Sequence, residues 1–116
     1  MELNETEKFA VETSRMIRTY FGNKMDTSGI YDAVEEANHH AFKIDFKVYD
    51  YFTIEFDYEN DVCEFFIVLT KEVKVSLTKE PAVYSQITDW DSYLKEIMAE
   101  IELRIPDKFL KAKGWM

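Results

Sequence analysis

The sequence predicts an α+β fold in which a four-stranded antiparallel meander is packed on one face by helices. Two observations carry this prediction. Apolar residues recur with a period of two from Phe42 to Leu69, as in half-buried strands, and with helical spacing towards both chain ends. The chain has 116 residues, of which 47% are hydrophobic, but only three Gly and two Pro. Residues 1–116 are therefore expected to form one domain without a linker.

Two helices are expected before the sheet. Asn4 followed by Glu7 is a capping-box pattern, and an apolar face that begins with Phe9, expected in the core, then runs towards Gly22, so the first helix is expected over residues 5–21. Ser28 is the expected cap of a short second helix that ends near two adjacent histidines. The apolar face of this second helix would consist of Ile30, Val34 and Ala37, and the histidines are His39 and His40.

The first two strands are expected over residues 42–48 and 52–58. A three-residue turn that opposes Val48 to Phe52 keeps both apolar rows on one face of the sheet. On the other face this register places polar residues opposite one another. The expected pairs are Lys43 with Asp57 and Asp45 with Glu55.

A third strand is expected after a two-residue turn at Asn60 and Asp61. This turn continues the core face, with Tyr58 opposite Cys63, Phe56 opposite Phe65 and Ile54 opposite Ile67. Phe66 and Val68 make the other side of the third strand apolar as well. The fourth strand, near residues 73–77, has two open registers: a two-residue turn would place its apolar residues beside Phe66 and Val68, and a three-residue turn would place them on the main core face.

The remaining residues are expected to form a connection and a pair of C-terminal helices. Thr88 with Asp91 is a second capping-box pattern, and a long apolar stripe follows until Pro106. A last short helix is expected over residues 107–113, with Gly114 at its end and Trp115 as a hydrophobic tail.

The formal charge of −9 restricts the partners that the chain can bind. The acidic excess lies in the first two-thirds of the sequence, which disfavours direct binding to nucleic acid or to an anionic membrane and permits a basic protein partner. The N-terminus lacks the pattern of a secretory signal, and no apolar run approaches about 18 residues. With a single cysteine, Cys63, expected to be buried, these features predict a cytoplasmic protein.

The acidic row Glu55, Asp57, Glu59 and Asp61 fits four interpretations: a metal site, a catalytic pair, a binding surface for a basic partner, or only the solvated face of the sheet. The last three acids have the spacing of a calcium loop, but Val62 stands where such a loop needs glycine and Val68 where it needs glutamate. Adjacent histidines point apart, and the serines and glycines form no nucleophile elbow or phosphate loop. We therefore predict no catalytic residue, no metal site and no cofactor.

A binding surface is the preferred interpretation. It would join the acids of the outer sheet face with the turn at residues 49–51 and with Phe66. The expected partner-binding residues are Asp45, Tyr49, Asp50, Tyr51, Glu55, Asp57, Glu59, Asp61, Glu64 and Phe66. The expected function is that of a non-enzymatic, acidic protein-binding module that occupies a basic surface, including one that normally holds nucleic acid.

In size, charge and α+β build the chain resembles small phage-encoded inhibitors of host defence nucleases, the anti-CRISPR type. The resemblance implies a nuclease as the partner. Immunity proteins that neutralise basic toxins share the same signature, so a toxin is the equal alternative. The resemblance covers no motif and assigns no role to any residue.

Self-association is the alternative from a different class. Phe66, Val68 and the edge of the fourth strand would pair with a second copy of the chain, which would then be a structural or assembly subunit forming at least a homodimer.

Overall fold

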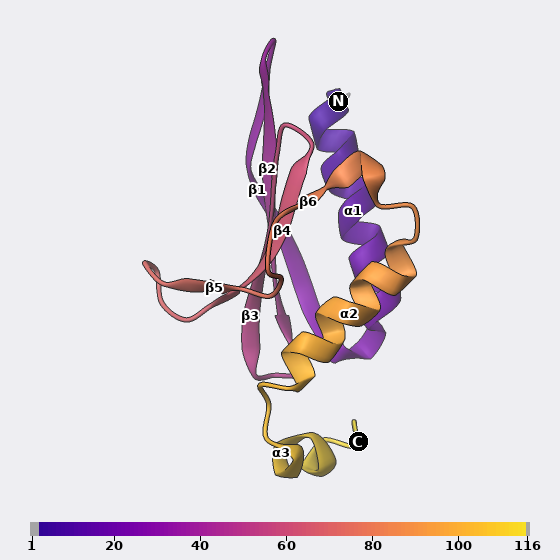
Figure 1. Ribbon diagram of the computed structural model, residues 1–116, viewed down its shortest axis with the longest axis vertical. Coiled ribbons are helices and arrows are strands. Elements are labelled where there is room, and N and C mark those ends of the chain that lie inside the picture. The colour runs from indigo at the N-terminus through magenta and orange to yellow at the C-terminus, as the bar shows by residue number, and fades with distance from the viewer. Residues whose placement is uncertain (1–2, 116) are drawn as a thin grey trace.

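A computed structural model describes residues 3–115 as an antiparallel sheet with helices on one side (Figure 1). The elements are α1 (Glu5–Phe21), η1 (Gly22–Lys24), β1 (Met25–Glu36), β2 (His39–Val48), β3 (Phe52–Glu59), β4 (Val62–Val68), β5 (Lys74–Ser76), β6 (Ala82–Val83), η2 (Tyr84–Gln86), α2 (Trp90–Glu102) and α3 (Asp107–Ala112). The strand order is β1-β2-β3-β4-β5, and β6 also pairs with β4. The α+β class is confirmed, whereas the expected count of four strands is too low.

Helix α1 begins and ends where the sequence predicts. The Asn4 side chain accepts a hydrogen bond from the Glu7 amide at 2.8 Å, and the Glu7 carboxylate accepts one from the Asn4 amide at 3.0 Å. Gly22 follows the helix with φ of 57°, which favours glycine. The buried face differs from the expected one, because the Phe9 side chain, predicted as core, is 41% exposed. The residues that α1 buries are Thr6, Ala10, Thr13, Ile17 and Phe21.

Residues 25–36 form strand β1, so the expected short second helix is wrong. Ile30 and Val34 are four residues apart, which fits one face of a helix, but in β1 they lie on opposite faces: Ile30 is opposite Ile44 on the core face and Val34 is opposite Ala41 on the outer face. The backbone breaks its regular pairing with β2 between Tyr31 and Val34, where Asp32 has φ of 53°. Pairing with β2 along both halves of this segment outweighs local helical spacing, because it satisfies the backbone of β2.

The registers expected for the β2–β3 and β3–β4 hairpins are confirmed. Val48 lies opposite Phe52, and the Lys43–Asp57 and Asp45–Glu55 pairs face each other on the outer side. The core pairs Tyr58–Cys63, Phe56–Phe65 and Ile54–Ile67 also form as expected. Both turns use left-handed backbone, at Tyr49 and Asp50 and at Asn60 and Asp61.

Strand β5 follows the three-residue alternative. The Leu69 amide donates to the Val73 carbonyl at 2.9 Å, and Val75 lies opposite Ile67. Only Leu77 is buried in the core, whereas Val73 and Val75 are exposed. Figure 1 shows the reason, since β5 projects away from the sheet on the side opposite the helices.

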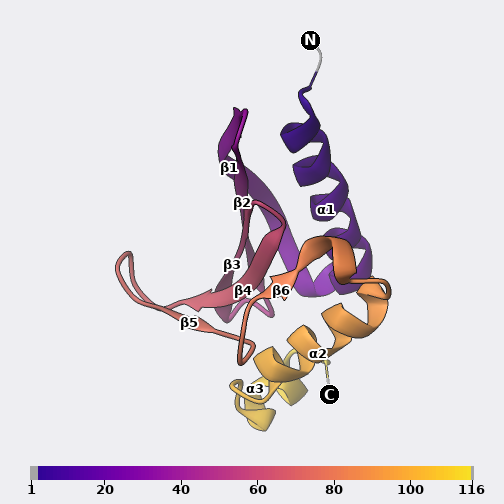
Figure 2. The same cartoon turned by 45° about the horizontal axis from the view of Figure 1, so that its top comes forward.

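The C-terminal helices close the core and one end of the sheet (Figure 2). Helix α2 is capped by Asp89, which accepts from the Ser92 amide at 3.1 Å, so the capping box expected at Thr88 is wrong. It buries Leu94, Ile97 and Ile101 against the sheet. Helix α3 forms as expected, and Trp115 beyond it packs edge-on against Tyr49 at 5.2 Å between ring centroids. Among residues 3–115, none of the helices combines the length and apolar character that a membrane crossing requires.

Candidate functional site

The outer sheet face is free of helices, but its central acids are already paired within the chain. Lys74 from β5 donates to Glu55 at 2.8 Å and to Asp57 at 2.7 Å, and its ammonium lies 4.3 Å from the centre of the Phe66 ring. The Tyr31 hydroxyl donates to Glu55 as well. These contacts leave Glu55 and Asp57 mostly covered, so the middle of the predicted binding face is partly neutralised.

Asp57 has an unusual pKa for a carboxyl group, because it is partly buried beside Glu55. Burial, and then the neighbouring charge of Glu55, raise the pKa of Asp57 to about 6, although Lys74 opposes this. Burial by itself raises the pKa of Glu55, but the neighbouring Asp57 and the hydrogen bonds from Lys74 and Tyr31 lower this pKa to about 2. The Asp57 Oδ1 atom is buried and has no hydrogen-bond partner within the described part of the chain. The site therefore favours binding one proton near neutral pH.

An Asp57→Asn substitution is expected to change the pH dependence of stability. Because folding raises the pKa of Asp57, its contribution to stability is full below pH 4 and is lost as the pH rises through about 6. Asparagine does not titrate, so the variant does not lose this contribution as the pH rises. The difference in unfolding free energy, variant minus original protein, should therefore increase by about 1 kcal/mol between pH 4 and pH 7, after allowance for the partial exposure of Asp57.

Urea denaturation at a series of pH values measures this difference. Asp45→Asn, on the same sheet face but exposed, is the matched control and should leave the pH profile unchanged. Parallel profiles for Asp57→Asn and the original protein would contradict the assignment.

The turn between β2 and β3 contacts α2 and the C-terminal residues, which bury Tyr49 but leave Asp50 and Tyr51 exposed. The Tyr49 side chain is fully buried and its hydroxyl donates to Glu102 of α2, so it is not accessible to a partner. This corrects the expectation that Tyr49 contributes to a binding surface. Tyr51 is half-exposed and packs against Phe109 of α3, and Asp50 lies 3.4 Å from the Lys113 ammonium.

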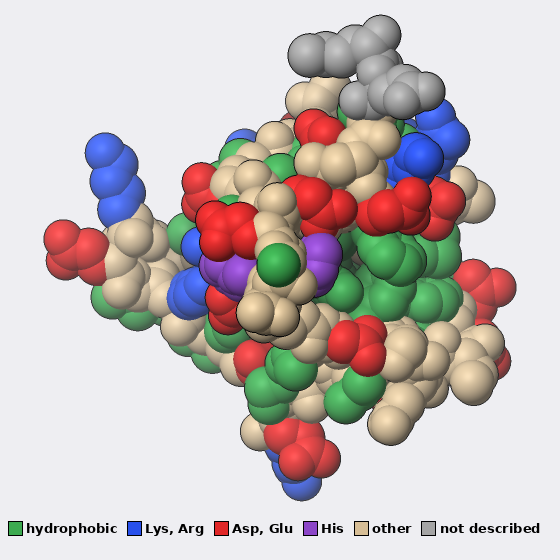
Figure 3. All heavy atoms as spheres, turned by 90° about the horizontal axis from the view of Figure 1, so that it is seen from above, with side chains coloured by type: hydrophobic (Ala, Val, Ile, Leu, Met, Phe, Trp, Pro, Cys, Tyr) green, Lys and Arg blue, Asp and Glu red, His purple; other side chains and the backbone are tan. Residues whose placement is uncertain are grey.

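Acids gather instead at the end of the sheet formed by the β1–β2 and β3–β4 turns. We call this surface the acidic end and define it by Glu35, Glu36, Glu59 and Asp61, of which Glu36 and Glu59 are exposed and Glu35 and Asp61 have half-buried side chains. Glu35 and Glu36 lie opposite His40 and His39 across the β1–β2 hairpin, and Glu59 contacts His39 at 2.7 Å. Figure 3, viewed from this end, shows acidic side chains around the histidines with an apolar area beside them. Residues 48–70, which supply Glu59 and Asp61, contain no Lys or Arg.

An exposed aromatic residue lies close to the acidic end. The Phe9 ring packs against Tyr84 at 5.7 Å and against Tyr58 at 6.4 Å between centroids, yet it remains 41% exposed. Tyr84 is joined to the β3–β4 turn because its amide donates to the Asp61 carbonyl at 2.8 Å. An accessible aromatic ring bordered by acids is a typical anchor for a protein partner. Sequence reasoning placed Phe9 in the core, because its helical spacing fits the buried face nearly as well as Ala10 does.

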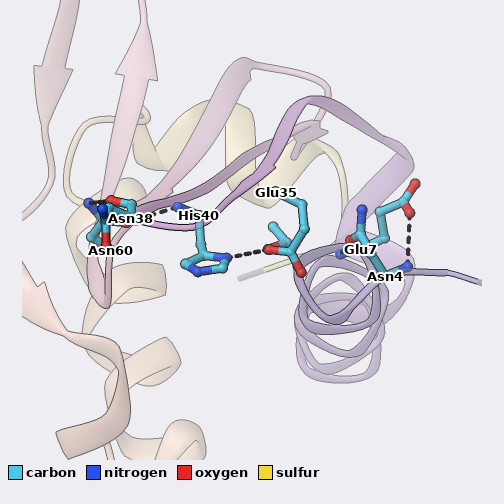
Figure 4. A network of polar contacts seen from close by, with 7 residues as sticks. Asn4, Glu7, Glu35, Asn38, His40 and Asn60 are labelled. Atoms are coloured by element: carbon cyan, nitrogen blue, oxygen red, sulfur yellow. Dashed lines mark hydrogen bonds and ion pairs between the residues drawn. The ribbon is translucent and has the colours of Figure 1, made fainter.

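The polar network at the acidic end joins α1 to the β1–β2 hairpin (Figure 4). Thr6 donates to Glu35 at 2.7 Å, and His40 Nδ1 contacts both the Glu35 carboxylate and the Thr6 hydroxyl. In a catalytic triad the acid and the nucleophile bond to different nitrogens of the imidazole, whereas here both lie at Nδ1. The network also lowers the pKa of Glu35, chiefly through the Thr6 hydrogen bond. Its geometry suits fixing the hairpin to the helix rather than proton relay.

The remaining candidates for chemistry have structural roles. Burial raises the pKa of the Cys63 thiol to about 12, so the reactive thiolate is disfavoured. Asp61 accepts hydrogen bonds from the Ser85 amide at 2.9 Å and from its hydroxyl at 2.6 Å, which fixes η2 to the sheet. Within residues 3–115, His, Cys, Asp and Glu side chains do not converge in groups of three that could hold a metal ion. The acids with calcium-loop spacing bond to different partners.

The two last predicted residues lie on the outer face. Glu64 accepts a hydrogen bond from the Ser76 hydroxyl, and Phe66 is half-buried under Lys74. The structure thus separates the predicted set into three groups: Asp45, Glu55, Asp57, Glu64 and Phe66 on the outer face, Glu59 and Asp61 at the acidic end, and Tyr49, Asp50 and Tyr51 at the opposite turn.

Comparison with known proteins assigns no family to the chain. No family model matches it, and neither the curated proteins nor the solved structures contain a match. The functional argument therefore depends on the geometry and charge described above.

Proposed function

We propose that the chain is a non-enzymatic, acidic protein-binding module that occupies a basic surface of a partner protein. The observation that carries the proposal is the acidic end, where exposed carboxylates from two hairpins lie beside the exposed Phe9 ring. A surface of this kind attracts a Lys- and Arg-rich patch over long range and then anchors it with an apolar contact.

The proposal moves the main contact surface from the centre of the outer sheet face to its end. Lys43, Lys47 and Lys74 alternate with the acids of the outer face and reduce its negative field. At the acidic end the side chains that contact the carboxylates are His39, His40 and the hydroxyls of Thr6 and Ser85, none of which is a Lys or an Arg. Asp45 and Glu64 lie on the outer face and not at the acidic end, and Tyr49 is left out because it is buried.

A basic surface that normally holds nucleic acid is the partner we favour. Such surfaces are dense in Lys and Arg, and carboxylates can occupy the positions of phosphates. A phage-encoded inhibitor of a host defence nuclease, of the anti-CRISPR type, or an immunity protein for a basic toxin would both act in this way. Both activities would place the protein in the cytoplasm.

Self-association through the sheet is the second candidate, and the β4–β5 hairpin favours it. Leu69, Val73 and Val75 are exposed on this projecting hairpin, where a second copy could cover them. Sedimentation velocity separates the two candidates, because a strictly monomeric profile at high protein concentration would contradict an assembly role.

Affinity capture across a salt series tests the main proposal. The immobilised protein is incubated with a lysate of the cell that encodes it or of that cell's host, and bound proteins are identified by mass spectrometry. A partner with a basic surface is expected, and its affinity should fall at least about tenfold between 50 mM and 500 mM salt, because the contact is electrostatic. A partner whose affinity does not change with salt would contradict the proposal.

A further inference from the structure

Strand β1 is the longest strand and has one side without a partner. It spans residues Met25–Glu36 at the end of the strand order, and pairs only with β2 within the described chain. Its pairing is interrupted between Met25 and Ser28 and again between Tyr31 and Val34, which leaves a regular segment over residues 28–31. An edge of this kind presents backbone groups that an additional strand can use.

The backbone groups that face outward can be identified from the ladder. The Asn60 amide donates to the His40 carbonyl at 2.8 Å, so even-numbered residues of β2 face β3 and odd-numbered residues face β1. On β1, Gly29 and Tyr31 lie opposite Asp45 and Lys43 and therefore bond to β2. Ser28 and Ile30 consequently direct their N–H and C=O groups away from the sheet.

This segment of the edge is accessible. The Ile30 side chain is 41% exposed, and Gly29 is exposed and carries no side chain. The Ser28 side chain bonds to Ser14 at 2.9 Å, which directs it towards α1 and leaves its backbone at the edge. The Arg18 guanidinium donates a hydrogen bond to the Asp26 carbonyl at 3.1 Å, so the unpaired part of the β1 edge begins after Asp26.

The charge of β1 selects the kind of strand that can be added. Its charged residues are all acidic, namely Asp26, Asp32, Glu35 and Glu36. A second copy of β1 would bring like charges together, which disfavours self-pairing at this edge. An extended segment with Lys or Arg at alternate positions would instead place its cations near these carboxylates.

We infer that the free edge of β1 takes up an extended, basic segment of the partner protein as an additional strand. The main-chain groups of Ser28 and Ile30 supply the hydrogen bonds, and the acids of β1 supply the selectivity, as in other cases of strand addition. The inference rests on the proposed function and adds to it the form in which part of the partner binds.

Hydrogen exchange followed by NMR tests the inference directly. The probe is a fluorescein-labelled synthetic peptide of alternating lysine and valine, and the matching peptide of alternating glutamate and valine is its control. In the free protein the amides of Ser28 and Ile30 should exchange rapidly, because they face solvent. The lysine peptide should slow their exchange at least about tenfold, and the glutamate peptide should not.

An Ile30→Pro variant removes the outward N–H but no hydrogen bond of the β1–β2 ladder. Proline is accepted at such a position of an edge strand, so the fold should persist. Fluorescence anisotropy should show binding of the lysine peptide weakened at least about tenfold, whereas Ile30→Thr, which keeps the N–H, should bind within about twofold of the original protein.

Three results would overturn the inference: no binding of the lysine peptide, binding without protection of Ser28 and Ile30, or equal binding by Ile30→Pro. If Ile30→Pro fails to fold, the exchange experiment on the original protein still decides. Failure here leaves the proposed function intact, because the salt series with the captured partner does not depend on the β1 edge.

Discussion

Replacing Tyr49 by alanine is expected to lower the free energy of unfolding by about 3–5 kcal/mol, the cost of a large cavity in a core. The side chain is 0% exposed, packs edge-on against Trp115, and donates its hydroxyl to Glu102 of α2. The substitution therefore removes a contact that joins the β2–β3 turn to both α2 and the C-terminal residues. Thermal unfolding should show a midpoint lower by about 10–20 °C.

Tyr51→Ala is the matched control, since it removes the same side chain two residues away. Tyr51 is 41% exposed and packs only against Phe52 and Phe109 among the aromatic residues described, so a loss of about 1 kcal/mol is expected. Tyr49→Phe isolates the hydroxyl and should cost about 1–2 kcal/mol, because Glu102 loses a donor. Equal losses for Tyr49→Ala and Tyr51→Ala would contradict the buried position of Tyr49.

Reversing two charges of the acidic end is expected to weaken binding to the captured partner about 100-fold at low salt. The variant combines Glu36→Lys with Glu59→Lys, both exposed, and the loss should arise mainly from slower association. Stability should change by less than about 1 kcal/mol, because exposed charges contribute little to folding. Surface plasmon resonance gives the rates, and circular dichroism gives the stability.

A second double reversal, Glu72→Lys with Glu96→Lys, has the same net charge and tests whether position matters. Both residues are exposed, on the β4–β5 hairpin and on α2, away from the acidic end. This variant should bind within about threefold of the original protein. If the two double variants lose affinity equally, overall charge and not the acidic end drives association.

Together, the proposed function and the inference about β1 describe a two-part contact with a basic partner. In this proposal the acidic end provides attraction with Phe9 as the anchor, and the β1 edge, which leads to Glu35 and Glu36 of the acidic end, provides main-chain hydrogen bonds. Because β1 leads directly to the acidic end, one partner segment could contact both. The two experiments with matched variants separate these contributions.

Local sequence patterns determined much of the sheet by themselves. The strict alternation from Phe42 to Leu69, together with short turns at residues 49–51 and 60–61, predicts the β2–β3 and β3–β4 registers correctly. A shift of one residue would move every apolar side chain to the solvent face, so the register follows from the pattern. Helices α1 and α3 were predictable for a similar reason, because the Asn4–Glu7 capping box of α1, and Pro106 and Gly114 at the ends of α3, act on residues close by in the sequence.

Tertiary contacts decided the features that local patterns leave open. Residues 25–36 became a strand because β2 offered unsatisfied backbone groups, which a helical spacing of Ile30 and Val34 does not reveal. Tyr49 became core because α2 and the residues after α3 fold back over the turn, from more than fifty positions further along the chain. Lys74 contacts Glu55 and Asp57 only because β5 pairs with β4. This contact partly neutralises the middle of the outer face and leaves more unpaired negative charge at the acidic end. The sequence by itself thus determined strands β2, β3 and β4 with their registers and the acidity of the outer face, whereas only long-range packing decided the edge strand β1 and which acids remain exposed.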